Sequence, residues 1–320
     1  MRLSAAIVIF VFLPTLVAQS PAPVPARAKP AAESKPATPT PPDRKAFTDA
    51  RGQKDPAAKL AALEKFLRDF PSSEMTAMAR REIVGEAMKR NPKDAVRRTK
   101  AMSRRLDPVD AAALNRFLAA ELVKEKKRLP DAEKAARQAL KQLEYAPFAA
   151  AARRQAESTK EPAPAEEAIR ARYANEQAQI KETLGQVLLA RGRTDQARQS
   201  FEEALGTNPS LSPAALALAG LSEKAGNLEK ALEYHAQAML ARPSPESRKR
   251  FSEAWNKVKG GEAGQKEWLD ERYRKLFASP LHPVKYTPGA KRSGRVVLGE
   301  LYTGAGCPPC LAADLAFDSM

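Results

Sequence analysis

The chain is poor in the residues that form metal centres and aromatic binding sites. Its 320 residues include two cysteines, two histidines and two tryptophans, and only 6% of the residues are aromatic. A structural zinc site needs about four ligands, usually cysteine and histidine. His235 and His282 are both distant in sequence from the cysteine pair Cys307 and Cys310. The sequence therefore predicts no metal site and no cofactor.

The chain also lacks an uninterrupted apolar run long enough for a comfortable membrane span. Its one apolar stretch, Leu3–Ala18, is interrupted by two polar residues and a proline. Arg2 precedes this stretch and the small residue Ala18 ends it before Gln19, which is the pattern of a signal peptide over residues 1–18. We therefore expect an exported protein, periplasmic or extracellular, that is not an integral membrane protein once processed. An uncleaved anchor is the alternative.

Residues 19–43 cannot build a core. They hold eight prolines and six alanines in 25 residues. Such a composition favours an extended chain that is partly polyproline II, with a reach of about 3.1 Å per residue. We predict a disordered linker that holds the folded part away from a membrane or envelope surface.

The net charge is strongly positive, at +16, from 54 lysines and arginines against 38 acidic residues. Residues 79–105 hold ten basic and three acidic residues, a net charge of +7. Such a balance permits nucleic-acid binding, but the export signal and the scarcity of aromatic residues argue against it. We predict no nucleic-acid partner, and we interpret the cluster as a solvated helix face or as an attraction to anionic envelope components.

The middle of the chain is rich in helix-forming residues, and its second half repeats with a period of about 34 residues. Small, apolar and turn-forming residues recur at matched positions: Leu184, Gly185, Leu188, Gly192, Ala197, Phe201, Ala204 and Pro209 in one unit, and Leu218, Ala219, Gly226, Ala231, His235, Ala238 and Pro243 in the next. Small residues let paired helices approach closely, glycines suit the turn between helices, and prolines end the second helix.

This pattern resembles the tetratricopeptide (TPR) repeat family over roughly Ala178 to Glu246. The resemblance implies a mostly α-helical solenoid of helical hairpins, whose surface binds a protein or peptide partner. His235 stands at an aromatic position of the repeat, so packing explains it better than catalysis. We expect TPR repeats and a final capping helix, which carries Trp255, Trp268 and Tyr273, over residues 166–278.

The first half of the helical body follows the pattern more loosely. Ala132, Ala136 and Ala139 resemble the second helix of a repeat, and Leu118 to Val123 resemble part of a first helix. We predict degenerate TPR-like hairpins over residues 44–156, joined to the repeats by a loop over 157–165. Two good repeats are marginal alone, so these neighbours are needed to cover their exposed faces.

The C-terminal segment, residues 295–320, changes character. An apolar, β-branched stretch, Val296 to Tyr302, leads through a turn of small residues to Cys307-Pro308-Pro309-Cys310, and apolar residues then recur at helical spacing. This order predicts a strand, a tight turn and a helix whose N-terminus carries the cysteines. Unpaired N–H groups and the helix dipole lower the pKa of a thiol at that place. Cys307 would be the attacking thiolate and Cys310 the resolving thiol.

Residues 295–320 resemble the start of a thioredoxin-like domain of the disulfide-exchange type, reached through a linker over 279–294. The resemblance implies thiol–disulfide exchange with a disulfide-bearing protein. It also implies a proton-accepting acid on the strand, a role that Glu300 could fill, although a surface charge at the strand end is the alternative. Gly306 stands where the family usually has tryptophan, so the usual aromatic wall beside the cysteines is not expected. A zinc half-site and a structural disulfide are the other interpretations of the pair.

Two functions follow from this organisation. The leading one is an exported thiol–disulfide exchange protein with a partner-binding repeat domain and an incomplete thioredoxin-like α/β segment at its C-terminal end. Because a thioredoxin-like sheet needs further strands, we expect the sequence to be a fragment of a longer product and to be inactive as an enzyme by itself. The alternative is a TPR scaffold that binds proteins without catalysis.

Overall fold

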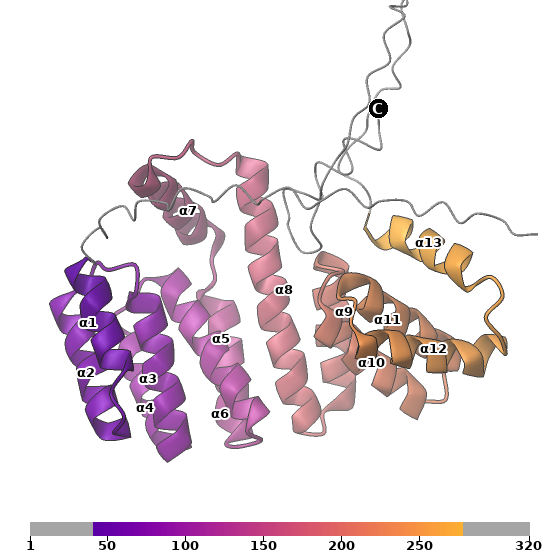
Figure 1. The fold of residues 1–320 in the computed structure, drawn as a ribbon, viewed down its shortest axis with the longest axis horizontal. Coiled ribbons are helices and arrows are strands. Elements are labelled where there is room, and N and C mark those ends of the chain that lie inside the picture. The colour runs from indigo at the N-terminus through magenta and orange to yellow at the C-terminus, as the bar shows by residue number, and fades with distance from the viewer. Residues whose placement is uncertain (1–40, 278–320) are drawn as a thin grey trace, which may run out of the picture. The chain divides into compact units, whose positions relative to one another are not determined.

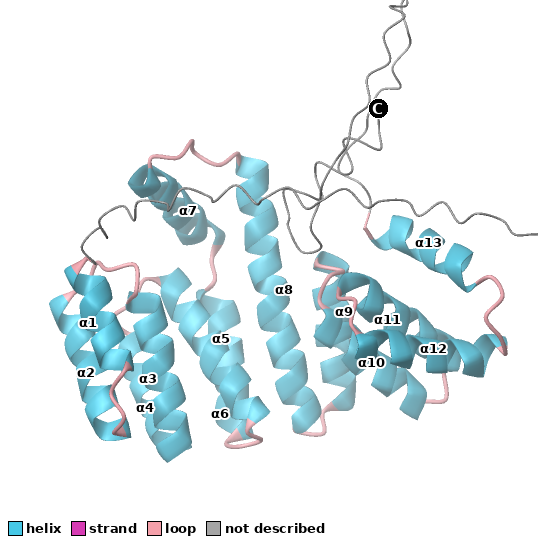
Figure 2. Ribbon diagram, viewed as in Figure 1, coloured by secondary structure: helices cyan, strands magenta, loops and turns pink. Residues whose placement is uncertain are grey.

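The computed structural model describes residues 41–277, and this range contains thirteen α-helices and no strand (Figures 1 and 2). The helices are α1 Pro42–Arg51, α2 Pro56–Asp69, α3 Thr76–Arg90, α4 Pro92–Ser103, α5 Pro108–Lys124, α6 Leu129–Gln142, α7 Tyr145–Thr159, α8 Glu166–Ala190, α9 Thr194–Thr207, α10 Ser212–Lys224, α11 Leu228–Ala241, α12 Pro245–Lys259 and α13 Gln265–Leu276. In this range no helix combines the length and the apolar character needed to cross a bilayer.

Most of the helices pack in consecutive pairs. α1 packs against α2, α3 against α4, α5 against α6, α8 against α9, and α10 against α11. Each pair also packs against the next pair in chain order, so the described residues form the stack of hairpins expected for a TPR-like solenoid. The first helices of neighbouring hairpins lie side by side, with α3 beside α5, α5 beside α8, and α8 beside α10. α7 is an insertion that packs against α5 and α8.

The turns of the second half show the repeat most directly. Gly192, Gly226 and Gly260 stand at equal intervals along the sequence, and each adopts a left-handed conformation with φ of +74° or +75°. The N–H of Gly192 bonds to the carbonyl of Leu189 and the next N–H bonds to Leu188, at 3.0 and 2.9 Å. The same two bonds recur at Gly226. Glycine is required there because a β-carbon disfavours this conformation, and the pattern is the Schellman ending of a helix.

The third glycine ends α12 in the same left-handed conformation. α13 begins five residues after Gly260, whereas α9 begins two residues after Gly192, and α13 packs mainly against α11. Phe251 and Trp255 of α12 and Trp268 of α13 form an aromatic cluster, with the two tryptophan rings 5.5 Å apart in an edge-to-face arrangement. α12 and α13 therefore cover the end of the stack without forming a paired hairpin like those before them.

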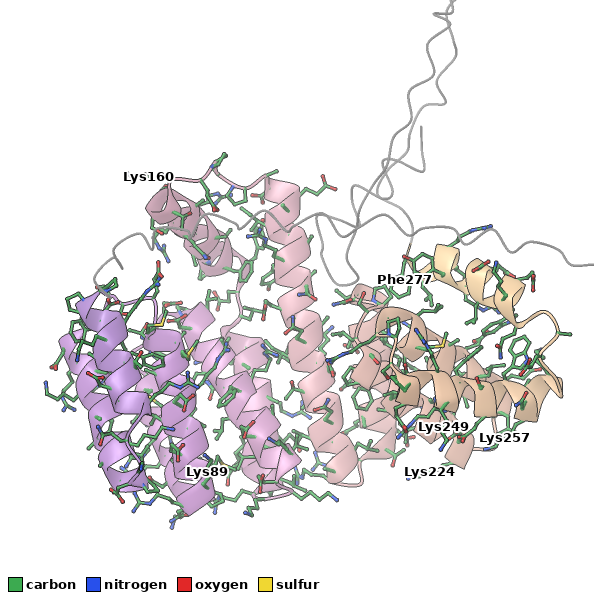
Figure 3. The ribbon with its side chains drawn as sticks, in the orientation of Figure 1. Lys89, Lys160, Lys224, Lys249, Lys257 and Phe277 are labelled. Atoms are coloured by element: carbon green, nitrogen blue, oxygen red, sulfur yellow. The ribbon has the colours of Figure 1, made fainter. Side chains whose placement is uncertain are left out.

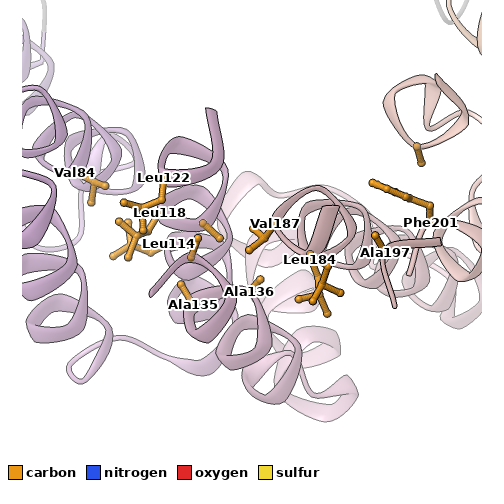
Figure 4. Close-up of a cluster of buried hydrophobic side chains, with 14 of the residues drawn as sticks. Val84, Leu114, Leu118, Leu122, Ala135, Ala136, Leu184, Val187, Ala197 and Phe201 are labelled. Atoms are coloured by element: carbon orange, nitrogen blue, oxygen red, sulfur yellow. The ribbon is translucent and has the colours of Figure 1, made fainter. Parts of the chain in front are cut away.

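A continuous core joins the looser hairpins to the better repeats. It runs from Val84 on α3 through Leu118 and Leu122 on α5 and Leu184 on α8 to Ala238 on α11 (Figure 4). Each fully buried leucine or phenylalanine contributes about 1.5–3 kcal/mol relative to an exposed one. The faces that two isolated repeats would expose are covered by their neighbours, as the physics of repeat proteins requires.

A buried carboxylate reinforces this junction. Glu133 of α6 is 7% exposed. It accepts a hydrogen bond from Nε of Arg137 at 2.9 Å, and it pairs with Arg191 and Arg193 at the turn between α8 and α9. Burial alone would raise the pKa of Glu133, but the bond from Arg137 and the three positive charges outweigh burial and hold that pKa below its ordinary value.

Two helix boundaries differ from the sequence prediction. α1 begins at Pro42, since proline is tolerated in the first turn of a helix, and Asp43 accepts a hydrogen bond from Ser73 at 2.6 Å. α7 continues to Thr159, inside the stretch predicted as loop, because Ser158 and Thr159 bond back to the carbonyl of Gln155. The helix ends where Lys160 adopts a left-handed conformation.

Candidate functional site

The predicted redox residues Cys307, Cys310 and Glu300 lie outside the described residues, as does His282. The thioredoxin-like α/β segment predicted over 295–320 lies there too, so the thiol chemistry stays a prediction. Of the residues singled out from the sequence, His235 is described. The candidate site in the described part of the chain is a surface of the hairpins.

The first helices of three hairpins expose matched positions on one surface. Its residues, which we call the first-helix surface, are partly exposed and recur on each helix at spacings of three and four: Ala113, Arg116 and Ala120 on α5, Gln179, Glu182 and Gln186 on α8, and Leu216 and Gly220 on α10. Positions so spaced share one face of a helix. Because α5, α8 and α10 lie side by side, the three faces adjoin.

The register of this surface is set by the turns. Arg116, Glu182 and Leu216 each stand at the same sequence interval before the left-handed turn residue that ends their helix, which is Lys126, Gly192 or Gly226. Leucines on the opposite sides of the helices, such as Leu118, Leu184 and Leu218, are buried in the core. The same amphipathic pattern that builds the hairpins therefore lines up these side chains.

Two opposite charges stand at the centre of the first-helix surface. Burial raises the pKa of Glu182, and the charge of Arg116 on the neighbouring helix lowers it by a smaller amount. Nε2 of Gln186 donates to the Glu182 carboxylate at 3.2 Å. Nε of Arg116 is buried with no protein hydrogen-bond partner among the described residues. A half-buried carboxylate whose pKa is raised by burial, beside an opposite charge, is a candidate functional group.

A small cleft continues this surface toward α3. It has a volume of about 300 Å³ and is lined by Met78, Gly85 and Lys89 of α3 and by Phe117 of α5, among others. Met78 is 45% exposed, which is uncommon for a large apolar side chain. The surface thus offers an apolar end near Met78 and Phe117 and a charged centre at Arg116 and Glu182.

His235 serves packing, as its repeat position predicts. The side chain is 6% exposed on α11, and its Nε2 lies 3.0 Å from Oε1 of Glu223. It reaches the wall of a cleft of about 350 Å³ whose other side carries charged residues of α12, including Lys249 and Lys257 (Figure 3). Glu223 is the hydrogen-bond partner of the ring among the described residues, and Glu246 and Glu253 also line the cleft.

Neither Arg116 nor Glu182 stands out in the sequence as a site residue. The inserted helix α7 lengthens the chain between them, so a search at the period of the repeat does not align them. Counting back from the turn residues aligns Arg116 with Glu182. This count requires knowing that Lys126, although it is not a glycine, ends α5 in a left-handed conformation.

Three comparisons with known proteins bear on these observations. Residues 188–249 match the family model of the tetratricopeptide repeat. A crystal structure of MamA is similar over 65% of this chain and 96% of that chain, with 17% sequence identity and a TM-score of 0.40. No curated protein matches the sequence. The family match and the equal spacing of the turns at Gly192 and Gly226 together support tetratricopeptide repeats within residues 188–249.

Proposed function

We propose that this protein is a scaffold that binds a protein partner on the first-helix surface. The supporting observation is that Arg116 and Glu182, at matched positions of adjacent hairpins, bring opposite and partly buried charges to the centre of that surface. Placing opposite charges on a rigid stack fixes the register of a bound chain, because a partner must present complementary groups at the same spacing. The apolar cleft at Met78 and Phe117 supplies area to bury.

Site-specific photo-cross-linking in the producing cell tests this proposal. A photoreactive residue at Gln179, on the first-helix surface, should yield a defined adduct, and the same residue at Gln199, exposed on the second helix α9, should not. Charge reversal by Arg116→Glu or Glu182→Lys should remove the adduct from position 179. Equal adducts from both positions, or an adduct that is insensitive to both reversals, would contradict a partner site here.

A second candidate function rests on the sequence of the C-terminal segment. The thiolate of Cys307 would attack a substrate disulfide, forming a mixed disulfide and releasing one substrate thiolate. The thiolate of Cys310 would then attack Sγ of Cys307 and release the second. The substrate is thereby reduced, the cysteine pair is oxidised, and a dithiol regenerates it. Glu300 would accept the proton of Cys310.

An insulin-reduction assay of the gene product with a dithiol separates the two functions. Cys307→Ser should abolish turnover, and Cys310→Ser should trap the mixed disulfide. Turnover that survives Cys307→Ser would exclude Cys307 as the nucleophile. If the unsubstituted protein shows no turnover either, the scaffold function is the one that remains. The signal-peptide pattern of residues 1–18 supports an exported, periplasmic or extracellular site of action, which fits disulfide chemistry.

A further inference from the structure

A second surface, on the other helices of the hairpins, concentrates the positive charge of the chain. α4 carries arginines and lysines on both of its sides, and a groove runs along each side. The groove between α2 and α4 has a volume of about 540 Å³. The groove between α4 and α6 has a volume of about 450 Å³. Six of the ten basic residues in the sequence cluster over residues 79–105 line these two grooves: Arg80, Arg97, Arg98, Lys100, Arg104 and Arg105.

The α2–α4 groove combines an apolar floor with a basic rim. Leu67, Ile83, Met102 and Leu106 line the floor. Five arginines line the rim against a single carboxylate, that of Glu64: Arg68, Arg80, Arg97, Arg98 and Arg105. A groove with this composition fits a ligand that presents apolar side chains on one face and negative charge beside them.

Part of this rim is already paired, and part is free to bind. Arg80 pairs with Asp110 at 2.7 Å, and Arg97 and Arg98 both pair with Asp94. Arg68 and Arg105 are exposed and have no ion pair among the described residues. The uncompensated charge therefore stands at the end of the groove where α2 and α4 finish.

The α4–α6 groove has the same bias. Lys100, Arg104 and Lys134 line it against one acid, Asp131, which already pairs with Arg128 at 2.6 Å. Lys100, Arg104 and Lys134 have no ion pair among the described residues. Their positive field adds to that of Arg68 and Arg105 in the neighbouring groove.

We propose that the α2–α4 groove binds an acidic, amphipathic segment of a partner protein, with apolar side chains on Met102 and Leu106 and carboxylates against Arg68 and Arg105. A nucleic acid fits less well, because no aromatic ring lines either groove and base stacking has no platform. A flat lipid surface would contact the arginines but could not reach the partly buried floor. This inference deepens the proposed protein-binding function and rests on it, but it concerns a different surface from the first-helix surface.

The test uses a labelled peptide of about 15 residues that alternates glutamate with leucine at helical spacing. Fluorescence anisotropy should show binding to the protein that weakens with salt. The variant Arg68→Glu/Arg105→Glu should bind at least about tenfold more weakly. A control with the same charge change, Arg154→Glu/Arg172→Glu, alters two exposed arginines on α7 and α8 that have no ion pair within residues 41–277, and it should bind as the parent does. Circular dichroism checks that both double variants are folded. If Arg68→Glu/Arg105→Glu is unfolded, Arg68→Gln/Arg105→Gln is used in its place.

Three outcomes would overturn the inference. If the control variant binds the peptide as weakly as Arg68→Glu/Arg105→Glu does, the effect is one of net charge alone. If a peptide with serine in place of leucine binds as tightly, the apolar floor does not contribute to binding. The third outcome is that duplex DNA or anionic vesicles bind more tightly than the peptide and bind more weakly to the Arg68→Glu/Arg105→Glu variant. That result would assign the groove to another class of ligand. Cross-linking at Gln179 is independent of these residues, so failure here is distinguishable from failure of the proposed function.

Discussion

The aromatic ring of Phe201 on α9 lies directly against Gly185 on α8. A β-carbon at Gly185 would come within 2.7 Å of ring atoms Cδ1 and Cε1, a distance that side chains do not tolerate. Phe201 is fully buried, so its ring has little room to move away. At the matched positions of the next repeat, the corresponding residues are Ala219 and His235. The same contact between two helices is therefore made by glycine and phenylalanine in one repeat and by alanine and histidine in the next.

Gly185→Ala should destabilise the protein by about 1–2 kcal/mol. Overpacking a core costs about 1–3 kcal/mol, and the better helix propensity of alanine returns up to about 1 kcal/mol. Urea unfolding of the single variants and of the double variant with Phe201→Leu measures the coupling. The alanine should cost nothing, or should stabilise, in the leucine background, because leucine leaves space for the β-carbon. Additive effects of the two changes would show that the ring and the glycine do not constrain each other.

Lys126→Gly should stabilise the protein by about 0.5–1 kcal/mol. Lys126 has φ of +53° at the place that Gly192 and Gly226 occupy in the repeats, and a non-glycine residue there carries backbone strain. Gly192→Ala should cost about 1 kcal/mol for the same reason, since no atom lies near its missing β-carbon and the whole effect comes from the backbone.

Gly206→Ala is the matched control for the turn variants. Its missing β-carbon also meets open space, but it lies within α9, so alanine should stabilise by up to about 1 kcal/mol. Thermal unfolding of the three variants should give opposite signs for the two glycines. The same sign for both would mean that the left-handed turn is not maintained in solution.

Glu133→Gln should destabilise the protein by about 1–3 kcal/mol at neutral pH, since hydrogen bonds to a charged group are worth about that much. The folded pKa of Glu133 is held below its ordinary value of 4.5. Its contribution is therefore complete above pH 4.5 and is lost as the pH falls through the folded pKa. Urea unfolding across this range should show the parent and the variant converging at low pH. Glu253→Gln alters an exposed residue that has no ion pair in the described part of the chain, and it should have little effect on stability across this pH range.

Glu182→Gln should have the opposite effect on stability. Burial raises the folded pKa of Glu182 above its ordinary value of 4.5, so the ionised side chain opposes folding at neutral pH. The variant should melt at a higher temperature than the parent there. The difference should shrink as the pH falls through the raised folded pKa and vanish below the ordinary value of 4.5, where both the folded and the unfolded parent are protonated. If the same variant also loses the cross-linked partner, Glu182 lowers the stability of the fold but is needed for binding, as expected for a functional charge. A lower melting temperature at neutral pH would place Glu182 among the stabilising residues.

The repeat was predictable because its determinants are local. Glycines at a left-handed turn and small residues where two helices touch are each required by the geometry of a single hairpin, so Gly192, Gly226 and Ala197 appear in the sequence at a readable period. The period stops after the second repeat: of the matched positions, α12 keeps Gly260, whereas polar residues such as Glu253 and Arg272 replace the small ones.

The amino-acid sequence by itself determined the helical hairpins, their period and the excess of positive charge. Only the tertiary structure placed Arg116 beside Glu182, and only it put the arginines around α4 along two grooves. The reason is that these neighbours belong to different hairpins. Their distance depends on how the hairpins stack and on the inserted α7, and no interaction between residues close in sequence encodes either.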